Sequence, residues 1–314
     1  MDTKLDIVAI GECLIELSTN AKMSAAGCLY KYYGGDALAT AISALRMGSK
    51  VGFITRVGND HFKDFLLDSW ETEGLDISQV KLTNEPNGLY IIAKPSINEK
   101  ELVYYRKKIA PSKLSIEDIN EEYIKCADVV YASGGTQSLS IAAAEAVEYA
   151  FKISKENGIL TAYDPNYHSL LTTADEAKEA FSRVRDNVDI MFLNTKHDSI
   201  NILELDSPEN IIKKLWDMGI QTVVLKSIDK AGYYTGYNGS IVFTDFYTTD
   251  FVDTTCSGDT FNGGFLHALN HGFTPFEATK FASITAGLQA KGIGAIKSIP
   301  YKDEVYEIYR GNNG

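Results

Sequence analysis

From about residue 128 onward, short apolar runs alternate with amphipathic stretches. Four runs have the continuous apolar character of buried strands: Val129-Val130-Tyr131, Ile159-Leu160-Thr161, Ile190-Met191-Phe192-Leu193 and Val223-Val224-Leu225. Their marker residues, Val129, Leu160, Met191 and Val224, lie 31, 31 and 33 residues apart. This spacing suits successive β-α-β units joined by right-handed crossovers. The pattern therefore predicts an α/β fold with a parallel sheet.

The first third of the chain has strict alternation instead. Two β-prone runs, at 89–93 and 101–106, flank the turn-forming segment 95–100, and a further alternating segment covers 12–18. The two runs predict a hairpin. Because a hairpin inside an α/β chain is typical of a small projecting sheet, and such appendages often cover active sites, we expect a lid.

Composition narrows the class of partner. The 314 residues are 45% hydrophobic and carry 30 Lys and Arg against 42 Asp and Glu, a net charge of −12. This acidic balance argues against binding nucleic acid or an anionic membrane through bulk charge. The four cysteines are scattered, which suggests neither a zinc site nor a disulfide framework. The apolar stretch 7–10 is too short for a signal core or a membrane span, so a cytoplasmic protein is expected.

Polar groups follow each of the four predicted strands. The segments are Ser133-Gly134-Gly135, Asp164-Pro165-Asn166, Asn194-Thr195-Lys196 and Lys226-Ser227. Loops are polar in general, so one such segment means little. Four of them at the carboxyl ends of parallel strands favour a ligand site in the crevice there.

The segment 253–269 carries the strongest chemical signal. A small polar turn, 255–258, leads into a helix whose apolar stripe contains Phe261 and Phe265. The amides at such a helix start can bind an anion or stabilise a phosphoryl group in transfer. Asp259 in the first turn is either a helix-dipole partner or a catalytic group.

A second predicted helix starts after two glycines, at Gly34-Gly35-Asp36, and ends at Gly48. Here Asp36 is either a plain N-cap or a ligand contact. The chain has no GxxxxGK[ST] loop, so phosphoryl transfer would need another architecture.

These segments resemble the PfkB or ribokinase-like carbohydrate kinases. Residues 253–263, DTTCSGDTFNG, are similar to the family's DTTGAGDTFNG signature, and Gly34-Gly35 with 56–62, RVGNDHF, is similar to its other signature. The resemblance runs from Asp6 to about Pro300. It implies a ribokinase-like, doubly wound α/β fold with a mostly parallel sheet, as a single domain over 1–314. A small β-sheet lid would be formed by 12–33 and 88–107.

The resemblance also implies roles for individual residues. Asp259 would be the base that activates a primary hydroxyl, and the backbone of Cys256, Ser257 and Gly258 would form an anion hole. ATP would be the phosphoryl donor, with Mg²⁺ held mainly through its phosphates and a monovalent cation such as K⁺ near Asp253 and Thr255. The nucleotide-side contacts implied are Asn194, Lys226, Ser227, Thr255 and Gly258.

Within that family the chain looks most like 2-keto-3-deoxygluconate kinases. The substrate contacts implied are Gly34, Gly35, Tyr90, Tyr105, Arg106, Asn166 and His168. Arg106 would clamp the carboxylate of an acidic sugar, and its alternative is a solvated hairpin charge.

Several positions depart from the family pattern. They are Ala39, His168, His197, Ile228, Cys256 and Ala295. The change at Cys256 is tolerable unless that residue needs a positive φ. Two alternatives follow: a kinase for a neutral sugar such as fructose or ribose, or for a nucleoside, and a sugar-binding protein with little kinase activity. Because an open lid sheet has edges that a second subunit can cover, a homodimer through the lid is also expected.

Overall fold

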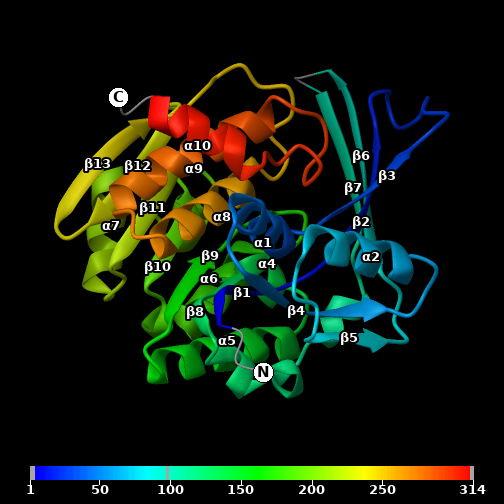
Figure 1. Cartoon of the computed structure of the whole chain (residues 1–314), viewed down its shortest axis with the longest axis horizontal. Coiled ribbons are helices and arrows are strands. Elements are labelled where there is room, and N and C mark those ends of the chain that lie inside the picture. The colour runs from blue at the N-terminus through cyan, green and yellow to red at the C-terminus, as the bar shows by residue number, and fades with distance from the viewer. Residues whose placement is uncertain (1–3, 97–98, 312–314) are drawn as a thin grey trace.

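The computed structural model describes residues 4–96 and 99–311, which form a nine-stranded and a four-stranded sheet (Figure 1). The larger sheet has the order β13-β12-β11-β10-β9-β8-β1-β4-β5. Its strands are β1 (Leu5–Ile10), β4 (Val51–Gly58), β5 (Val80–Thr83), β8 (Ala127–Ser133), β9 (Leu160–Asp164), β10 (Ile190–Asn194), β11 (Thr222–Ser227), β12 (Gly232–Tyr237) and β13 (Ser240–Asp245). Among the described strands of this sheet, the pairs β11–β12 and β12–β13 are antiparallel and the others are parallel. The predicted, mostly parallel α/β sheet is confirmed.

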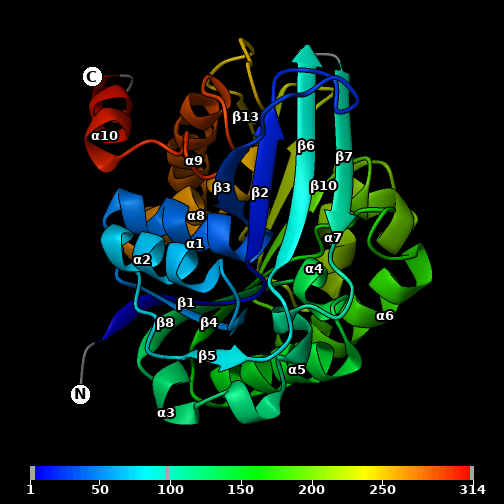
Figure 2. The same ribbon diagram turned by 90° about the vertical axis from the view of Figure 1, so that its right-hand side faces the viewer.

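Helices cover both faces of this sheet (Figure 2). One face packs on α1 (Asp36–Met47), α2 (Lys63–Glu73), α8 (Ser257–Asn270), α9 (Pro275–Ala290) and α10 (Lys302–Gly311). The other packs on α3 (Glu121–Ile124), α5 (Ile141–Glu156), α6 (Ala174–Val184) and α7 (Pro208–Asp217). Within β1, Ile7 and Ala9 join the first core and Val8 and Ile10 the second. Burial on both faces explains why these strands read as continuous apolar runs.

The strand order reverses at β1, which lies between β8 and β4. From there the chain enters the lid before it returns to the main sheet through α1 and β4. At such a reversal the loops beyond the carboxyl ends of the strands diverge and leave a crevice. The short helix α4 (Gly134–Gln137) begins directly after β8, at this same edge.

The lid is the four-stranded sheet, with the order β3-β2-β6-β7. Its strands are β2 (Leu14–Thr19), β3 (Tyr30–Gly34), β6 (Gly88–Ser96) and β7 (Glu99–Tyr105), which fall in the predicted spans 12–33 and 88–107 except for Gly34 at the end of β3. They stand side by side above one edge of the main sheet (Figures 1 and 2). The pair β6–β7 is the predicted hairpin. Residues 97–98 of its predicted turn lie outside the described residues.

Alternation along the lid strands gives the lid an inner and an outer face. On β7, Leu102 and Tyr104 face the main domain, whereas Val103 and Tyr105 are 39% and 57% exposed. No helix within the described ranges has the length and apolar character needed to span a membrane.

Candidate active site

A cavity of about 210 Å³ lies between the lid and the carboxyl edge of the main sheet. The lid and its connections contribute Glu12, Leu14, Gly35, Tyr90, Ile92, Lys100, Leu102 and Tyr104. The main domain contributes Asp36, Gly135, Asn166, His168, Leu171, Thr254, Thr255, Cys256 and Asp259. Segments far apart in the sequence therefore meet at the place where the polar strand ends predicted a ligand.

Asp259 faces this cavity from the first turn of α8, with a side chain that is almost fully buried. The Asn166 side-chain amide donates to its Oδ1 at 3.1 Å and to Asp36 Oδ2 at 3.3 Å. Burial raises the pKa of Asp259 well above its ordinary value, and the neighbouring Asp36 carboxylate raises it further. A carboxyl group with a raised pKa beside a cavity has the properties of a general base.

The start of α8 points backbone amides toward the same place. Cys256 is the N-cap residue, and the first four amides of a helix have no partner within the helix. One amide of the predicted anion hole is already used, because Ser257 N–H donates to the Thr254 carbonyl at 3.1 Å. The amides of Cys256 and Gly258 remain for an anion.

Cys256 has φ 61° and ψ 13°, in the left-handed region. The substitution of cysteine for the family's glycine therefore falls at a position that does need a positive φ. The Cβ of an L-residue in this region costs roughly 1–2 kcal/mol. The helix start is thus built on a strained residue.

A buried ion pair supports the base of the cavity. Lys226 Nζ donates to Asp164 Oδ2 at 2.6 Å and to the Gly258 carbonyl at 3.3 Å. The Asn262 side-chain amide donates to the same Asp164 oxygen at 2.7 Å. Lys226, predicted to contact the nucleotide, therefore ties β11 to the start of α8 and has partners within the protein.

The other predicted nucleotide-side residues lie at the ends of β10 and β11. Asn194 Oδ1 accepts the amides of Lys196 and His197 at 2.8 and 3.2 Å. Ser227 is buried at the last position of β11. His197 is exposed, and the buried acid of this loop is its neighbour Asp198.

Asp198 was not identified from the sequence. It accepts the Asn194 amide at 2.6 Å and the Tyr167 amide at 2.8 Å, so it joins the loops after β9 and β10. Burial and the charge of Asp164 raise its pKa. Its carboxylate is occupied by the backbone, which makes its role the shape of the two loops.

A second, more apolar cavity of about 260 Å³ lies on the other side of the α8 start. Aromatic residues dominate its wall: Tyr233, Phe246, Tyr247 and Phe251, with Ile228 and Gly287 nearby. Thr254 lines both cavities. The N-terminus of α8 therefore lies between two pockets, as transfer of a group from one ligand to another requires. This pocket could not be predicted from the sequence because its aromatic residues are spread over strands and loops.

Arg106 does not line the sugar-sized cavity. Its guanidinium donates from Nε to Glu12 Oε2 at 2.6 Å, from Nη1 to Ser138 Oγ at 3.1 Å and from Nη2 to the Gly135 carbonyl at 2.5 Å. All three of its nitrogens are engaged, because the Glu12 carboxylate is buried and needs a charged partner. Arg106 thus braces the cavity wall, and the predicted carboxylate clamp is not retained for it.

Of the two tyrosines predicted to contact the substrate, one lines the cavity and the other does not. Tyr105, predicted to reach the substrate, lies on the outer lid face, and its neighbour Tyr104 lines the cavity instead. Tyr90 lines it too and donates a hydrogen bond from its hydroxyl to the buried Glu16.

The two glycines lie where the backbone has no room for a side chain. Gly35 has φ 131°, and a Cβ there would lie 2.3 Å from the Glu12 carbonyl, so only glycine fits. Gly34 lies under the Tyr90 ring, where a Cβ would be 2.5 Å from its hydroxyl.

Lys100 is the cation that the sequence analysis missed. It lies on the same face of β7 as Leu102 and Tyr104 and lines the cavity. It makes no ion pair or hydrogen bond to any residue that the structure describes. Although Lys100 is exposed at its end of β7, desolvation at the cavity and the charge of Lys94 lower its pKa. The signal in the sequence was its spacing of two from Leu102.

His168 completes this side of the cavity, edge-on to the Tyr104 ring. Its Nδ1 accepts the Leu170 amide at 3.3 Å, an assignment that leaves the Nε2 proton as a donor. Burial and the charge of Lys100 lower its pKa, so it is neutral at neutral pH. It can therefore donate a hydrogen bond to an anion held by Lys100.

The two residues predicted to lie near a monovalent cation, Asp253 and Thr255, already have partners within the protein. The Asp253 carboxylate is paired with Lys94 of β6, and the Thr255 carbonyl accepts the Gln289 side-chain amide at 2.9 Å. As they stand, these groups do not fit a bound cation. No cluster of three or more His, Cys, Asp or Glu suited to a metal occurs in the described part of the chain.

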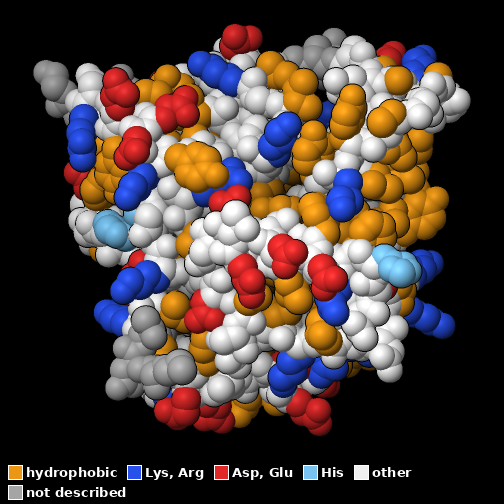
Figure 3. Space-filling view, turned by 45° about the vertical axis from the view of Figure 1, so that its right-hand side comes forward, with side chains coloured by type: hydrophobic (Ala, Val, Ile, Leu, Met, Phe, Trp, Pro, Cys, Tyr) orange, Lys and Arg blue, Asp and Glu red, His pale blue; other side chains and the backbone are white. Residues whose placement is uncertain are grey.

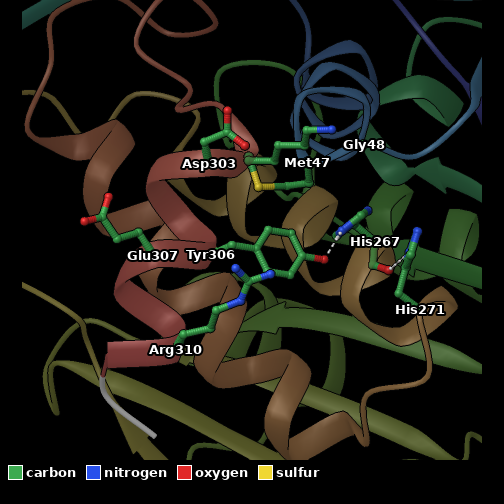
Figure 4. A pocket seen from close by; sticks show the side chains of 9 residues that line it. Met47, Gly48, His267, His271, Asp303, Tyr306, Glu307 and Arg310 are labelled. Carbon is green, nitrogen blue, oxygen red and sulfur yellow. Dashed lines mark hydrogen bonds between the residues drawn. The ribbon is translucent and has the colours of Figure 1, made fainter. Parts of the chain in front are cut away.

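A larger concavity, of about 710 Å³, lies at the far end of α8, beside α1 and α10 (Figure 4). His267 points into its wall, and both ring nitrogens have partners: Ser49 Oγ at 2.8 Å and Tyr306 Oη at 2.9 Å. Burial lowers the pKa of His267 to about 3, so the ring is neutral. These contacts attach α10 to the core, and they make this concavity a structural feature.

Known proteins are similar to this chain in sequence and in fold. Residues 4–302 match the model of the pfkB family carbohydrate kinases. The chain is 28% identical over 314 residues to the 2-dehydro-3-deoxygluconokinase of Thermoproteus tenax, covering 98% of this chain and 95% of that protein. It is 26% identical over 307 residues to the 5-dehydro-2-deoxygluconokinase of Clostridium beijerinckii, covering 95% and 90%. A putative ribokinase II from E. coli, solved in complex with ATP and Mg²⁺, matches with a TM-score of 0.89 at 22% identity, covering 98% and 99%.

Because the family model spans nearly the whole chain, this protein belongs to the pfkB family of carbohydrate kinases. The expected ribokinase-like fold with a small β-sheet lid is confirmed, and the lid sheet has four strands.

Replacing the strained helix start by Cys256→Gly should stabilise the protein relative to Cys256→Ala. Both variants lose the thiol, but only glycine relieves the positive φ, which is worth about 1 kcal/mol in the free energy of unfolding. Urea unfolding with unchanged m-values measures the difference. Equal stability of the two variants would mean that φ at this residue carries no strain.

Asp259→Asn should reduce turnover by about 100- to 10,000-fold, the usual contribution of a general base. It should also raise Tm at pH 7. Because burial raises the native pKa of Asp259 above its unfolded value, ionising it destabilises the native state above about pH 4 and not below. Thermal melts from pH 3.5 to 8, compared with the wild type, check this. A variant that keeps wild-type turnover would remove Asp259 from the chemistry.

Proposed function

We propose that this protein transfers the γ-phosphoryl group of ATP to the primary hydroxyl of a keto-deoxy sugar acid, with 2-keto-3-deoxygluconate as the first candidate. The names of two relatives that align over nearly the whole chain support this substrate class. Because the identities to these relatives are only 28% and 26%, the proposal of an acidic substrate also needs support from the side chains that line the cavity.

The main evidence for an acidic substrate is the unpaired Lys100, which lines the cavity beside the neutral His168. An ammonium group without a counter-ion, close to a second lysine, gains Coulomb energy when an anion binds. A carboxylate that accepts from Lys100 and from His168 Nε2 would receive two hydrogen bonds, one of them charge-assisted. A neutral sugar would leave Lys100 without a partner.

Asp259 supplies the base in this proposal. As the primary hydroxyl oxygen attacks the γ-phosphorus, its proton passes to the Asp259 carboxylate, the new O–P bond forms, and the bond from phosphorus to the ADP oxygen breaks. The amides of Cys256 and Gly258 would stabilise the negative charge on the transferring group. Asn166, which donates to Asp259, holds that carboxylate toward the cavity.

The apolar cavity beyond the start of α8 suits the nucleotide. Its aromatic wall can pack against a planar base, while Thr254, at the boundary of the two cavities, lies toward the phosphates. Mg²⁺ would be held mainly by the phosphates of ATP. There it would neutralise charge on the phosphate oxygens.

A panel of acidic and neutral sugars with ATP, assayed on the wild type and on Lys100→Met, tests the proposal. The wild type should prefer the keto-deoxy acids. Lys100→Met should lower kcat/KM for the acids by about 10- to 100-fold, the loss of one charge-assisted hydrogen bond, and should change neutral sugars little. Lys107→Met, which removes an exposed lysine just beyond β7, is the matched control.

A wild type that phosphorylates fructose, ribose or a nucleoside and ignores the acids would favour a neutral-sugar kinase. Undetectable binding of ATP and Mg²⁺ by calorimetry would favour a sugar-binding protein with little kinase activity.

We also propose that residues 1–314 act as one cytoplasmic α/β domain with its lid, paired as a homodimer through the outer lid face. Val103 and Tyr105 there are 39% and 57% exposed, and hydrophobic side chains gather on the lid side of the surface (Figure 3). Strands β3 and β7 are the edges of the lid sheet. Sedimentation should give a dimer mass for the wild type and a monomer for Val103→Asp. A monomeric wild type would contradict this pairing.

A further inference from the structure

One lysine of the lid reaches the loop that leads into α8. Lys94, on β6, is paired with Asp253, and their side chains are only 14% and 4% exposed. Lys94 follows Tyr90 and Ile92 along β6 at a spacing of two. Regular alternation therefore places it on the inner face of the lid, toward the main domain.

The Asp253 carboxylate has no free oxygen. Its Oδ2 accepts from Lys94 and from the Gly294 amide at 3.1 Å, and its Oδ1 accepts the Thr255 amide at 3.0 Å. Burial alone would raise the pKa of Asp253, but the hydrogen bonds and charge of Lys94 and the Thr255 amide lower it overall. The carboxylate is thus held ionised by a cation from the lid.

The carbonyl oxygens next to Asp253 are also occupied. Gln289 of α9 is fully buried, and the two hydrogens of its Nε2 are shared among three oxygens: the Thr255 carbonyl at 2.9 Å, Ser298 Oγ at 3.2 Å and the Ala295 carbonyl at 3.4 Å. A monovalent cation is bound by oxygens that replace its hydration shell. Here the positive charge comes from the Lys94 ammonium group, and the Gln289 side-chain amide donates to the remaining oxygens.

We propose that Lys94 and Gln289 take the place of a bound monovalent cation in this kinase. Lys94 is a positioning residue: its ammonium group fixes Asp253 and, through the Thr255 amide, the turn that presents the amides of Cys256 and Gly258. Because Lys94 belongs to the lid, the turn is fixed when the lid is seated on the main domain. This inference rests on the proposed function only for its kinetic consequence.

The stability test needs no substrate. Tm is measured for the wild type, Lys94→Met and Lys107→Met in K⁺, NH₄⁺ and tetramethylammonium salts of equal ionic strength. The wild type and Lys107→Met should melt at the same temperature in all three salts. Lys94→Met should melt lower in tetramethylammonium and recover in K⁺ or NH₄⁺, because a cation that binds only the native state stabilises it.

Turnover should follow the same pattern. Wild-type kcat should be the same in the three salts. In tetramethylammonium, Lys94→Met should lose about tenfold in kcat, since the amides that stabilise the transferred group are no longer held in place, and K⁺ should restore most of it. KM for the sugar should change less than kcat, because Lys94 itself does not line the cavity.

A wild type whose Tm or kcat depends on K⁺ would overturn the proposal, and this measurement needs no variant to fold. So would a Lys94→Met protein that matches the wild type in tetramethylammonium, or one that neither K⁺ nor NH₄⁺ improves. If Lys94→Met does not fold, Lys94→Gln, which keeps a hydrogen-bond donor without the charge, replaces it. A wild type that phosphorylates no sugar while the Tm pattern holds would reject the proposed function and leave the cation replacement supported.

Discussion

Asp164 and Asp259 are buried and Asp36 is half-buried at the carboxyl edge of the main sheet, and the repulsion among these three carboxylates governs the arrangement around them. Asp164 is neutralised by Lys226. Asp36 and Asp259 share the Asn166 amide, which offsets their repulsion without adding a positive charge. Asp259 therefore keeps a raised pKa and faces the cavity, whereas a directly paired aspartate would be a weaker base.

The lid carries charges of a different kind. On its inner face, Lys94 is paired with Asp253 and Lys100 is unpaired. One lysine ties the lid to the main domain and the other leaves a positive charge over the cavity. Since burying an unpaired charge is costly, Lys100 stays at the more exposed end of β7. In the proposed function, the same sheet would cover the site and favour an anionic ligand.

The start of α8 joins these two systems. Its turn is held by Asp253 on one side and by Lys226 on the other, and it lies between the two cavities. The positive φ of Cys256 is part of this geometry, because it lets the chain turn sharply into the helix. Strain at such a point persists only when the surrounding contacts over-determine the conformation.

The sequence by itself determined the class of fold, the presence of a small β-sheet lid, the start of α8 and the family. These features depend on local periodicity, glycine positions and a contiguous signature, all of which are properties of neighbouring residues. The position of Asp259 in the first turn of α8 followed from the same local signal.

Only the tertiary structure decided which charged or aromatic side chains face the ligand. Arg106 pairs with Glu12, which is 94 residues away, and Lys94 pairs with Asp253, which is 159 residues away. Tyr104 faces inward in place of Tyr105 because a shift of one residue along a strand reverses the face. The partner of a buried charge is set by whichever opposite charge the fold brings close, and nothing local in the sequence specifies that.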